Sequence, residues 1–392
     1  MCTDRSNAIV NPLLCIIPPH MLQKIAENGT NEQKEVAIDT LRATAQFQSE
    51  RRFEPLIRSL EGVESAPGMM RRIYDAQNGS TLPGVLVRSE ADPEHSDIAV
   101  NEAYDGSGNT YLLFKDVYGR DSIDGAGMDI ESVVHYRTGY DNAYWNGRYM
   151  VYGDGDEDMP VAQRLFNRFT VAMDVIGHEL THGVTSYTAN LYYYEQSGAL
   201  NESFSDVFGI LTKQRALGQS AAESDWVIGA GVFTPNVQGV GIRSMANPGT
   251  AYNDPVLGRD PQPGHMNNYV STTEDNGGVH INSGIPNRAF YITSLELGGS
   301  AWEKAGRIWY TTLRDRLTAR SNFQQAADLT YDVAGSLFGS GSLEQQAVRT
   351  GWREVGILTG SDVTPPTPPA PPTENRGCLP TVAGLFRPGG KS

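Results

Sequence analysis

Two histidines, His178 and His182, lie four residues apart in the run HELTH, with Glu179 beside the first of them. Residues four apart share one face of an α-helix, so both imidazoles can reach the same metal ion while Glu179 projects beside them. A catalytic zinc also needs a third protein ligand and an open position for water. The same run occurs on ordinary helices with two buried, hydrogen-bonded histidines. The pattern therefore predicts a zinc hydrolase if a third ligand lies elsewhere in the chain.

The third ligand is expected in the downstream run SGALNESFSD. Nineteen residues separate His182 from Glu202, and Asp206 follows Glu202 by four positions on the same predicted helix. We predict that Glu202 is the third ligand and that Asp206 accepts the other N–H of a ligand histidine. Two solvated helix charges are the alternative for this pair. A metzincin would read HExxHxxGxxH, but Thr185 and Thr188 occupy those Gly and His positions, which excludes that class.

A further cluster lies in EDNGGVHINSG at 274–284, where Asp275 precedes His280 by five residues across a Gly-Gly turn. A carboxylate in that position can orient and charge the imidazole. A protonated His280 can then hydrogen-bond the oxyanion that forms when a carbonyl is attacked. The alternative is a histidine that caps the following helix. The chain contains no GxSxG run, so a serine hydrolase has little support.

The charge balance excludes some partners. Thirty-one Lys and Arg residues against 46 Asp and Glu residues leave the 392-residue chain at −15. Nucleic acids and anionic membranes attract clustered basic side chains, so we expect neither as a partner. The hydrophobic content of 39 % fits a globular protein, and this length favours two packed domains with appendages. No apolar run of about 18 residues is present, so no membrane span is predicted.

The terminal segments carry all the cysteines, so we expect no disulfide framework and no cysteine hydrolase; they are Cys2, Cys15 and Cys378. The apolar stretch at 13–17 is short and ends in two prolines, which does not fit a Sec signal peptide. We therefore expect a cytoplasmic protein, or one that is secreted by a route without a signal peptide.

The pattern of apolar residues and turn residues changes along the chain. Residues 1–66 predict a helical leading segment, with Asn31 capping a helix through NEQKEVAIDTLRATAQFQ. Between 71 and 155, short apolar runs alternate with turns such as AYDGSGNT and GDGDED, which predicts an antiparallel, strand-rich domain. Helical spacing dominates from 165 to 358. The run TPPTPPAPPT then predicts an extended spacer, or alternatively a ligand for a proline-reading domain.

Several of these runs together resemble the thermolysin family of zinc metallopeptidases: HELTH, SGALNESFSD, NAYWNG, VYGDGDED, RSMANPGTAYNDP and EDNGGVHINSGIPNRAFY. The likeness covers residues 70–358. The run IIPPHMLQKIAENG resembles the short precursor segment of the protealysin-like branch. The resemblance implies an α+β, two-domain fold, mainly β in its N-terminal half and α-helical in its C-terminal half, with the active-site cleft between them. We expect a propeptide-like segment at 1–66, the two domains at 67–176 and 177–358, and a disordered Pro-rich tail at 359–392.

The resemblance also assigns roles to residues. The implied ligands of one zinc per chain are His178, His182 and Glu202. Glu179 would polarise the attacking water and pass its proton to the leaving amine. Tyr193 and His280 would stabilise the oxyanion, with Asp275 behind His280. Counting back from SGALNE selects Tyr193 from the three consecutive tyrosines at 192–194.

Other residues of the family pattern bind substrate. By resemblance, Asn142 and Ala143 of NAYWNG bind an extended substrate backbone, and Arg243 contacts the carbonyl on the primed side. The implied pocket for the residue after the scissile bond is lined by Val175, Ile228 and Ile242. Such an apolar pocket favours bulky aliphatic or aromatic side chains. We therefore expect a neutral endopeptidase that cleaves proteins or peptides before bulky hydrophobic residues.

The double calcium site of secreted thermolysins is expected to be absent. Asp174 and Asp225 keep matching positions, but Lys213, Val227 and Ala230 stand where the family has acidic residues. A lysine ammonium cannot bind calcium, although it can neutralise the two remaining carboxylates. The alternative is a Lys213 that points to solvent. GDGDED at 153–158 leaves other calcium binding uncertain, since solvated turn charges explain it equally well.

The leading segment is expected to act as an intramolecular inhibitor that maturation removes. A Cys15 thiolate on the zinc is conceivable, although a buried cysteine is the commoner case. One rival function is another HExxH zinc peptidase of the aminopeptidase kind, which would need an anchor for the substrate's free amine. A noncatalytic binding or inhibitory protein is the other, and it would be expected to have lost Glu179 or a ligand.

Overall fold

The computed structural model describes residues 14–50 and 68–359, and only the backbone of residue 14 and residues 46–50. The predicted end of the leading segment near residue 66 and the Pro-rich tail therefore lie outside the described residues, as do Cys2 and Cys378. Within the described ranges, no helix combines the length and the apolar character that a membrane crossing requires.

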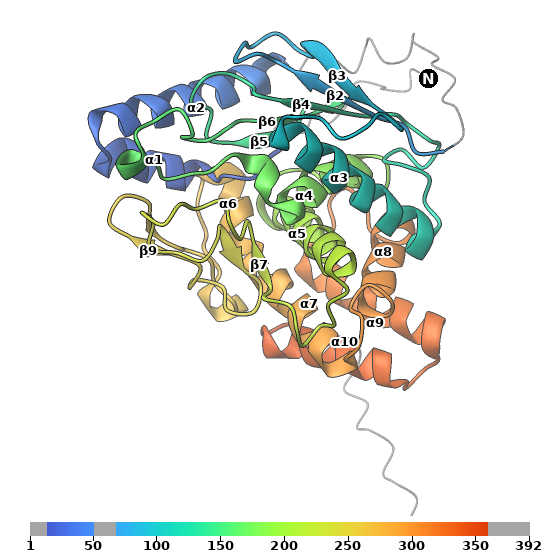
Figure 1. Cartoon of the computed structure of the whole chain (residues 1–392). Coiled ribbons are helices and arrows are strands. Elements are labelled where there is room, and N and C mark those ends of the chain that lie inside the picture. Colours follow the sequence, from blue (N-terminus) through green and yellow to red (C-terminus); the bar gives the residue numbers. More distant parts are fainter. Residues whose placement is uncertain (1–13, 51–67, 360–392) are drawn as a thin grey trace, which may run out of the picture. The chain divides into compact units, whose positions relative to one another are not determined.

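A six-stranded mixed sheet forms one layer of the structure (Figure 1). Its strands, in spatial order, are β1 (Leu14–Cys15), β5 (Ala143–Trp145), β6 (Tyr149–Tyr152), β4 (Ile130–Val134), β2 (Arg71–Asp75) and β3 (Val85–Ser89). Strand β4 pairs in parallel with both β2 and β6, so the prediction of an antiparallel domain is wrong. Parallel neighbours need a crossover connection, and the chain supplies one between β3 and β4.

That crossover is helix α3 (Ile98–Leu112), and it contains the run AYDGSGNT that we predicted to be a turn. Glycine is a poor helix former, so the local sequence favours a turn. Tertiary packing explains the helix. A Cβ at Gly106 would overlap the Ile176 side chain, and one at Gly108 would overlap the Arg71 guanidinium. The two glycines therefore let α3 lie close to its neighbours, and this close packing outweighs their low helix propensity.

The leading segment consists of β1 followed by two helices, α1 (Pro19–Asn28) and α2 (Asn31–Glu50). The second helix is capped by Thr30 and not, as predicted, by Asn31. The Thr30 hydroxyl accepts a bond of 3.3 Å from the Gln33 N–H, and the Gln33 side chain accepts one of 2.8 Å from the Thr30 N–H. This reciprocal pair is a capping box, so the first helical residue is Asn31.

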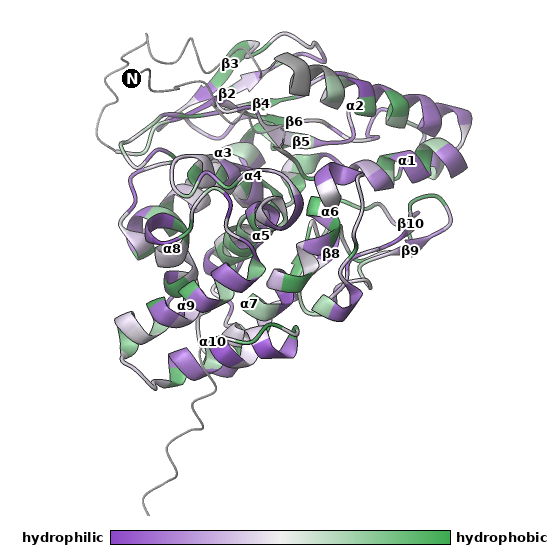
Figure 2. Cartoon of the chain, turned by 180° about the vertical axis from the view of Figure 1, so that it is seen from behind, coloured by the Kyte–Doolittle hydropathy of each residue, from purple (hydrophilic) through white to green (hydrophobic). Residues whose placement is uncertain are grey.

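In the described residues, seven α-helices follow the sheet: α4 (Met173–Ser186), α5 (Glu195–Leu217), α6 (Asp275–Asn282), α7 (Gly284–Leu297), α8 (Ala305–Asp315), α9 (Phe323–Phe338) and α10 (Leu343–Glu354). Figures 1 and 2 place α4 and α5 between the sheet and helices α7, α9 and α10. This arrangement confirms the expected α+β fold with a β-containing N-terminal half and a helical C-terminal half. The predicted boundary between residues 176 and 177 falls inside α4.

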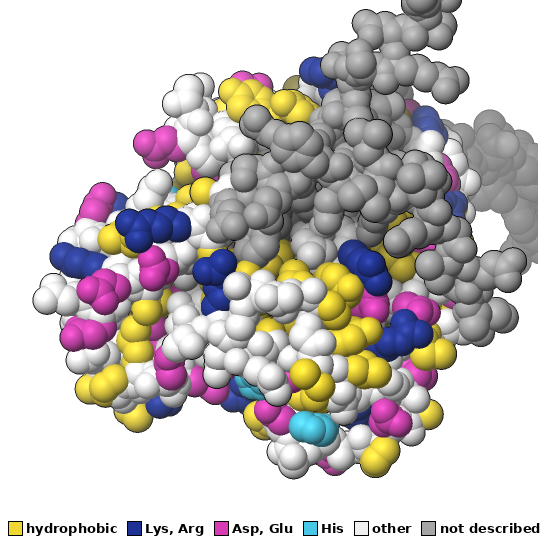
Figure 3. Space-filling model, turned by 90° about the horizontal axis from the view of Figure 1, so that it is seen from above, with side chains coloured by type: hydrophobic (Ala, Val, Ile, Leu, Met, Phe, Trp, Pro, Cys, Tyr) yellow, Lys and Arg dark blue, Asp and Glu magenta, His cyan; other side chains and the backbone are white. Residues whose placement is uncertain are grey.

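Two small two-stranded sheets complete the C-terminal half: β7 (Val227–Ile228) with β8 (Arg243–Ser244), and β9 (Asn253–Asp254) with β10 (Gly258–Arg259). The sheet of β7 and β8 lies near α4, since the N–H of Gly229, directly after β7, donates to Asp174 of α4 at 2.9 Å. On the described part of the face shown in Figure 3, basic and acidic side chains are interspersed with hydrophobic ones.

Candidate metal centre and active site

Two glycines set the distance between the helices that carry the predicted ligands. A Cβ at Gly177 would lie 3.0 Å from the Cα of Gly209, and one at Gly209 would overlap the backbone oxygen of Asp174. A side chain at Gly209 would clash and one at Gly177 would be tight, so the two glycines let α4 and α5 approach closely along this line. The side chain of His178, next to Gly177, therefore faces α5 directly.

This contact brings the three predicted ligands together. The Nε2 atoms of His178 and His182 lie 3.0 Å apart, and carboxylate oxygens of Glu202 lie 3.5 Å from each of them. All three side chains are fully buried. In the described parts of the chain, they form the one group of three ligating side chains whose donor atoms converge closely enough to hold a metal ion.

The other ring nitrogens fix the tautomers of the two histidines. Nδ1 of His178 lies 2.8 Å from the carboxylate of Asp206, and Nδ1 of His182 lies 2.9 Å from the side-chain oxygen of Asn201. Both partners are acceptors, so each Nδ1 carries the proton and each Nε2 presents a lone pair. Burial lowers the pKa of His178 to about 4 and that of His182 to about 3, so both are neutral at pH 7. Two lone pairs that face each other across 3.0 Å repel without a cation, and a His-His-Glu set suits zinc.

Asp206 occupies its predicted place behind His178 and also binds Arg243. The Arg243 guanidinium donates to both oxygens of Asp206, at 2.7 and 2.9 Å, and the Asn287 amide donates to one of them at 2.8 Å. Burial alone would raise the pKa of Asp206, but Arg243 and His178 outweigh it and hold this pKa well below its usual range. Asp206 is therefore a carboxylate that can accept the His178 N–H.

Glu179 lies one residue along α4 from His178, and its side chain is fully buried. The backbone N–H of Trp145, on β5, donates to its carboxylate over 3.1 Å. This bond ties the carboxylate of a residue on the ligand-bearing helix to the sheet. A carboxylate held next to a metal site is suited to accept and release a proton.

Tyr193 is the tyrosine of its run that reaches the triad. Its side chain is 2 % exposed, whereas Tyr194 is 40 % exposed. The Tyr193 hydroxyl donates a short hydrogen bond to Glu202 and lies 3.2 Å from Nε2 of His280. Counting back from SGALNE therefore selected the residue that faces the site.

His280 and Asp275 meet as the sequence predicted, because α6 is not a regular helix. Its residues Asn276, Gly277 and Gly278 have positive φ angles, which turns Asp275 back toward His280. The Asp275 carboxylate accepts from His280 Nδ1 at 2.6 Å and from the His280 backbone N–H at 2.9 Å. Burial would lower the pKa of His280, but Asp275 and Glu202 raise it to about 9. His280 is thus charged at pH 7, and both of its ring nitrogens can donate.

The chain's own leading segment lies in extended form across this site. The carbonyl oxygen of Cys15 accepts from Nε2 of His280 at 3.1 Å. The N–H of the next residue, Ile16, donates to the Ala143 carbonyl at 3.2 Å, and its carbonyl accepts from Arg243 at 3.0 Å. Ala143 and Arg243, predicted to bind substrate, therefore both contact an extended backbone.

Asn142 makes the corresponding contacts one residue further along the segment. Its side chain accepts from the N–H of Ile17 at 2.9 Å and donates to the Ile17 carbonyl at 3.3 Å. Ile16 and Ile17 belong to the same hydrophobic core as the three predicted pocket residues, all of them buried: Val175, Ile228 and Ile242.

Two family models match the sequence of this chain. Residues 29–186 match the family described as "Thermolysin metallopeptidase, catalytic domain", and residues 189–357 match "Thermolysin metallopeptidase, alpha-helical domain". The chain belongs to the thermolysin family of metallopeptidases. This confirms the family that the sequence motifs indicated, and with it the two-domain fold.

Individual relatives agree. An extracellular metalloprotease of Pectobacterium carotovorum is 48 % identical over 349 residues, which cover 88 % of this chain and 97 % of the relative. A thermolysin of Alicyclobacillus acidocaldarius is 40 % identical over 296 residues, 72 % of this chain and 50 % of that protein. The solved structure of the precursor of protealysin, a metalloproteinase from Serratia proteamaculans, superposes with a TM-score of 0.79 at 46 % identity, covering 88 % of this chain and 100 % of that one.

Residues that the sequence analysis missed hold this thermolysin-family site together. Asn201 and Ser205, which lie four residues apart on either side of Glu202, both contact Nδ1 of His182 at 2.9 Å. Their spacing of four residues within SGALNESFSD places them on one face of the helix, and the sequence could have indicated this. Trp145 could not be found in this way, because it contributes a backbone N–H whose position depends on the sheet.

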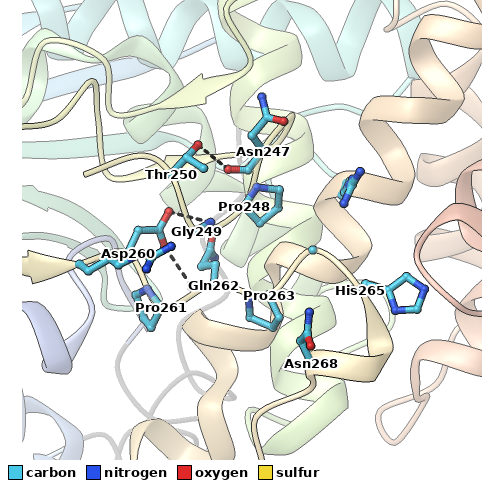
Figure 4. Close-up of a pocket in the computed structure, with 13 residues that line it drawn as sticks. Asn247, Pro248, Gly249, Thr250, Asp260, Pro261, Gln262, Pro263, His265 and Asn268 are labelled. Carbon is cyan, nitrogen blue, oxygen red and sulfur yellow. Dashed lines mark hydrogen bonds between the residues drawn. The ribbon is translucent and has the colours of Figure 1, made fainter. Parts of the chain in front are cut away.

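Gln262 was missed as well, and it binds the backbone of His280. Its side-chain amide donates to the His280 carbonyl at 2.7 Å and to the Ser283 hydroxyl at 3.1 Å. Gln262 also lines a separate hollow of about 640 Å³, in which Asp260 accepts from the backbone N–H groups of Gly249 and Gln262 (Figure 4). The wall of this hollow is thus hydrogen-bonded to the backbone of His280 through Gln262.

Proposed function

We propose that this chain is a zinc-dependent endopeptidase with one zinc per chain, held by His178, His182 and Glu202. The observation that carries the proposal is the convergence of these three side chains, together with a charged His280 that lies 3.6 Å from Glu202 and binds a carbonyl of an extended peptide. Membership of a metallopeptidase family supports it. All the residues that hydrolysis requires are present, which argues against a noncatalytic binding or inhibitory protein.

The residues divide the chemistry between them. Zinc, when bound, acts as a Lewis acid and lowers the pKa of a bound water toward about 7. Glu179 takes a proton from the attacking water and delivers it to the leaving amine. His280 and Tyr193 donate to the carbonyl oxygen as it becomes negative, and Asp275 keeps His280 oriented and charged. Asp206 and Asn201 hold the ligand histidines in the metal-binding tautomer.

We further propose that cleavage falls before bulky hydrophobic residues. The contacts of Ile16 and Ile17 support this, since their backbones bind Asn142, Ala143 and Arg243 while both side chains are buried. Val175, Ile228 and Ile242 are the proposed lining of the pocket for the residue after the scissile bond. Because the bound segment extends on both sides of the catalytic groups, an endopeptidase fits better than an aminopeptidase.

The leading segment is proposed to be the intramolecular inhibitor of a precursor. It occupies the site through the edge strand β1, which pairs with β5. Its α2 helix also docks on the body, where Gln33 donates to the Gln163 carbonyl at 2.7 Å and Thr40 accepts from the Asp141 N–H at 3.2 Å. The likeness to a solved precursor supports this reading. Cys15 presents its carbonyl to His280, which does not support a thiolate ligand.

The double calcium site is proposed to be absent. The Lys213 ammonium lies 3.1 Å from Asp174 and 3.0 Å from Asp225, and it donates to the Val227 carbonyl at 3.2 Å. Lys213 therefore does not point freely to solvent. Its ammonium group forms ion pairs with both of the carboxylates that, by resemblance, would bind calcium.

Proteins or peptides are the proposed substrates, and neither nucleic acid nor membrane is a proposed partner. One relative is named an extracellular metalloprotease, which supports the proposal that this protein acts outside the cell. The route of export, by a signal peptide or without one, stays a prediction.

Zinc content and turnover in one variant test the proposed function. Glu179 is beside the ligands without being one, so Glu179→Ala should retain one zinc per chain and lose peptidase activity. Metal analysis and hydrolysis of an added peptide measure the two properties. Turnover by Glu179→Ala at the wild-type rate would rule out the assigned mechanism.

A further inference from the structure

The Cys15–Ile16 peptide bond occupies the position of a bond about to be cut. Its carbonyl oxygen accepts from Nε2 of His280 at 3.1 Å, and that nitrogen lies 3.6 Å from Glu202 of the metal triad. The nitrogen of the same bond donates to the Ala143 carbonyl at 3.2 Å. The carbonyl of this peptide bond is therefore bound by a proposed catalytic residue, and its nitrogen by a proposed substrate-binding residue.

We infer that the zinc-loaded chain hydrolyses its own Cys15–Ile16 bond, within the same molecule. The inference rests on the proposed endopeptidase function and adds a specific bond and a specific order of events. The segment presents the Cys15 carbonyl to His280, a proposed oxyanion donor. Here the segment runs through the site as a substrate does.

Contacts on both sides hold the bond in register. On the N-terminal side, β1 pairs antiparallel with β5, so that Leu14 lies opposite Trp145 and Cys15 opposite Tyr144. The same strand β5 binds Glu179, which accepts from the Trp145 N–H. Two neighbouring residues are therefore aligned before the scissile bond.

On the C-terminal side, the backbone is bound for two further residues. Arg243 donates to the Ile16 carbonyl at 3.0 Å, and Asn142 exchanges two hydrogen bonds with Ile17 at 2.9 and 3.3 Å. The side chain of Ile16 is fully buried and that of Ile17 is 1 % exposed. A one-residue slip would break these bonds and move both side chains, so the register is well specified.

The reaction is a balanced hydrolysis. Water attacks the carbonyl carbon of Cys15, the carbon–nitrogen bond to Ile16 breaks, and the oxygen of water stays in the new Cys15 carboxylate. Glu179 takes a proton from the water and gives it to the Ile16 nitrogen, which leaves as an amine. His280 donates to the carbonyl oxygen while it is negative. The products are residues 1–15 and a chain that begins at Ile16.

This cut does not by itself clear the cleft. The new chain end keeps its bonds to Arg243 and Asn142, and the α2 helix keeps its contacts through Gln33 and Thr40. On the other side of the cut, the described residues Leu14 and Cys15 are held by a two-residue strand pairing with β5, so the short fragment leaves more easily. We therefore place the Cys15–Ile16 cut before release of the rest of the leading segment, as a step that leaves the enzyme inhibited.

The first test follows the mass and the N-terminal sequence of the metal-free full chain after one equivalent of zinc is added. The expected result is loss of residues 1–15 and a new N-terminus at Ile16, at a rate that stays constant over a tenfold dilution. Glu179→Gln should remain intact. A chain that keeps residues 1–15 after zinc loading, or a cut whose rate falls with dilution, overturns the inference.

A metal-independent readout tests the register itself. In the metal-free full chain, the amide hydrogens of Ile16 and Ile17 are bound to Ala143 and Asn142 and should exchange slowly with solvent. Exchange of both at the rate of an unstructured peptide would overturn the inference without any measurement of activity.

A matched pair of full-length variants separates this inference from the proposed function. Ile16→Asp puts a charge into an apolar site and should slow the Cys15–Ile16 cut at least about 100-fold while opening the cleft to an added peptide. Ile38→Asp, at a 37 % exposed position of α2, should cut itself like the wild type. If Ile16→Asp cleaves the added peptide while the wild-type bond stays intact, the inference alone fails. If zinc-loaded Ile16→Asp cleaves no peptide, the proposed function fails too.

Discussion

Two buried glutamates within one site acquire different roles from what surrounds them. Glu202 receives the Tyr193 hydroxyl and lies 3.5 Å from the Nε2 atoms of both ligand histidines. Glu179 receives a backbone N–H from the sheet instead. These surroundings suit the proposed roles, in which Glu202 is a metal ligand and Glu179 moves a proton. At this scale, the neighbours of a carboxylate decide its chemistry more than its residue type does.

The Tyr193 hydroxyl gives a prediction with a built-in control. Tyr193→Phe should lower kcat about 100-fold with little change in KM, because it removes one donor to the developing oxyanion. Tyr194→Phe, at the 40 % exposed neighbour, should behave like the wild type. Steady-state kinetics on one peptide compares the two. Equal activities of both variants would show that Tyr193 has no part in the reaction.

Among the structural elements, one histidine ties the sheet to helix α3. His135 follows β4, and its two ring nitrogens lie 2.8 Å from Asp154 and 2.8 Å from Asp97. Asp97 is also the N-cap of α3, where it accepts from the Ala99 N–H. The bond to Asp154, helped by Asp97, outweighs burial and raises the pKa of His135 to about 9. The imidazolium therefore bridges two elements at pH 7.

This bridge predicts a pH-dependent contribution to stability. The folded-state pKa of about 9 lies above the unfolded value of 6.5, so the contribution is complete below about pH 6.5 and disappears as the pH rises through 9. His135→Asn, which suits the φ of +53° at this position, should cost about 2 kcal/mol at pH 6 and much less at pH 10. Thermal unfolding in the metal-free Glu179→Ala background measures it. A cost that does not depend on pH would refute the charged bridge.

The sequence predicted the site better than the elements around it. HELTH, Glu202 and the Asp275–His280 pair could be predicted because they depend on spacing along helices and on one turn. The helix through AYDGSGNT could not, because contacts with Ile176 and Arg71 overcome the preference of its glycines. The parallel pairing of β4 was missed for the same reason, since that helix is the crossover that makes it possible.

At the scale of the whole molecule, the leading segment is part of the fold it is proposed to inhibit. It contributes an edge strand to the sheet, and Ile16, Met21 and Ile25 to the main hydrophobic core. Only the short run IIPPHMLQKIAENG indicated this, and the sequence could not show which peptide bond meets His280. That register follows from pairing between β1 and β5, which are about 130 residues apart.

The body should unfold at a temperature that does not depend on calcium. Lys213 already neutralises Asp174 and Asp225, so zinc-loaded Glu179→Ala should show the same melting temperature with and without millimolar calcium. Lys213→Ala leaves the two carboxylates uncompensated and should melt lower, with part of the loss restored by calcium. A large calcium-dependent rise before Lys213 is changed, with ions bound between Asp174 and Asp225, would show that the lysine does not replace the metal.

Mapping cleavage sites on a peptide library tests the central claim most directly. The zinc-loaded enzyme, once it has released its leading segment, should cut before Leu, Ile, Val and Phe, because the proposed pocket of Val175, Ile228 and Ile242 is apolar and cannot pair a charge. The same preparation of Glu179→Ala should produce no fragments. A preference for Lys or Asp after the cut, or the same fragments from Glu179→Ala, would contradict a zinc endopeptidase of this specificity.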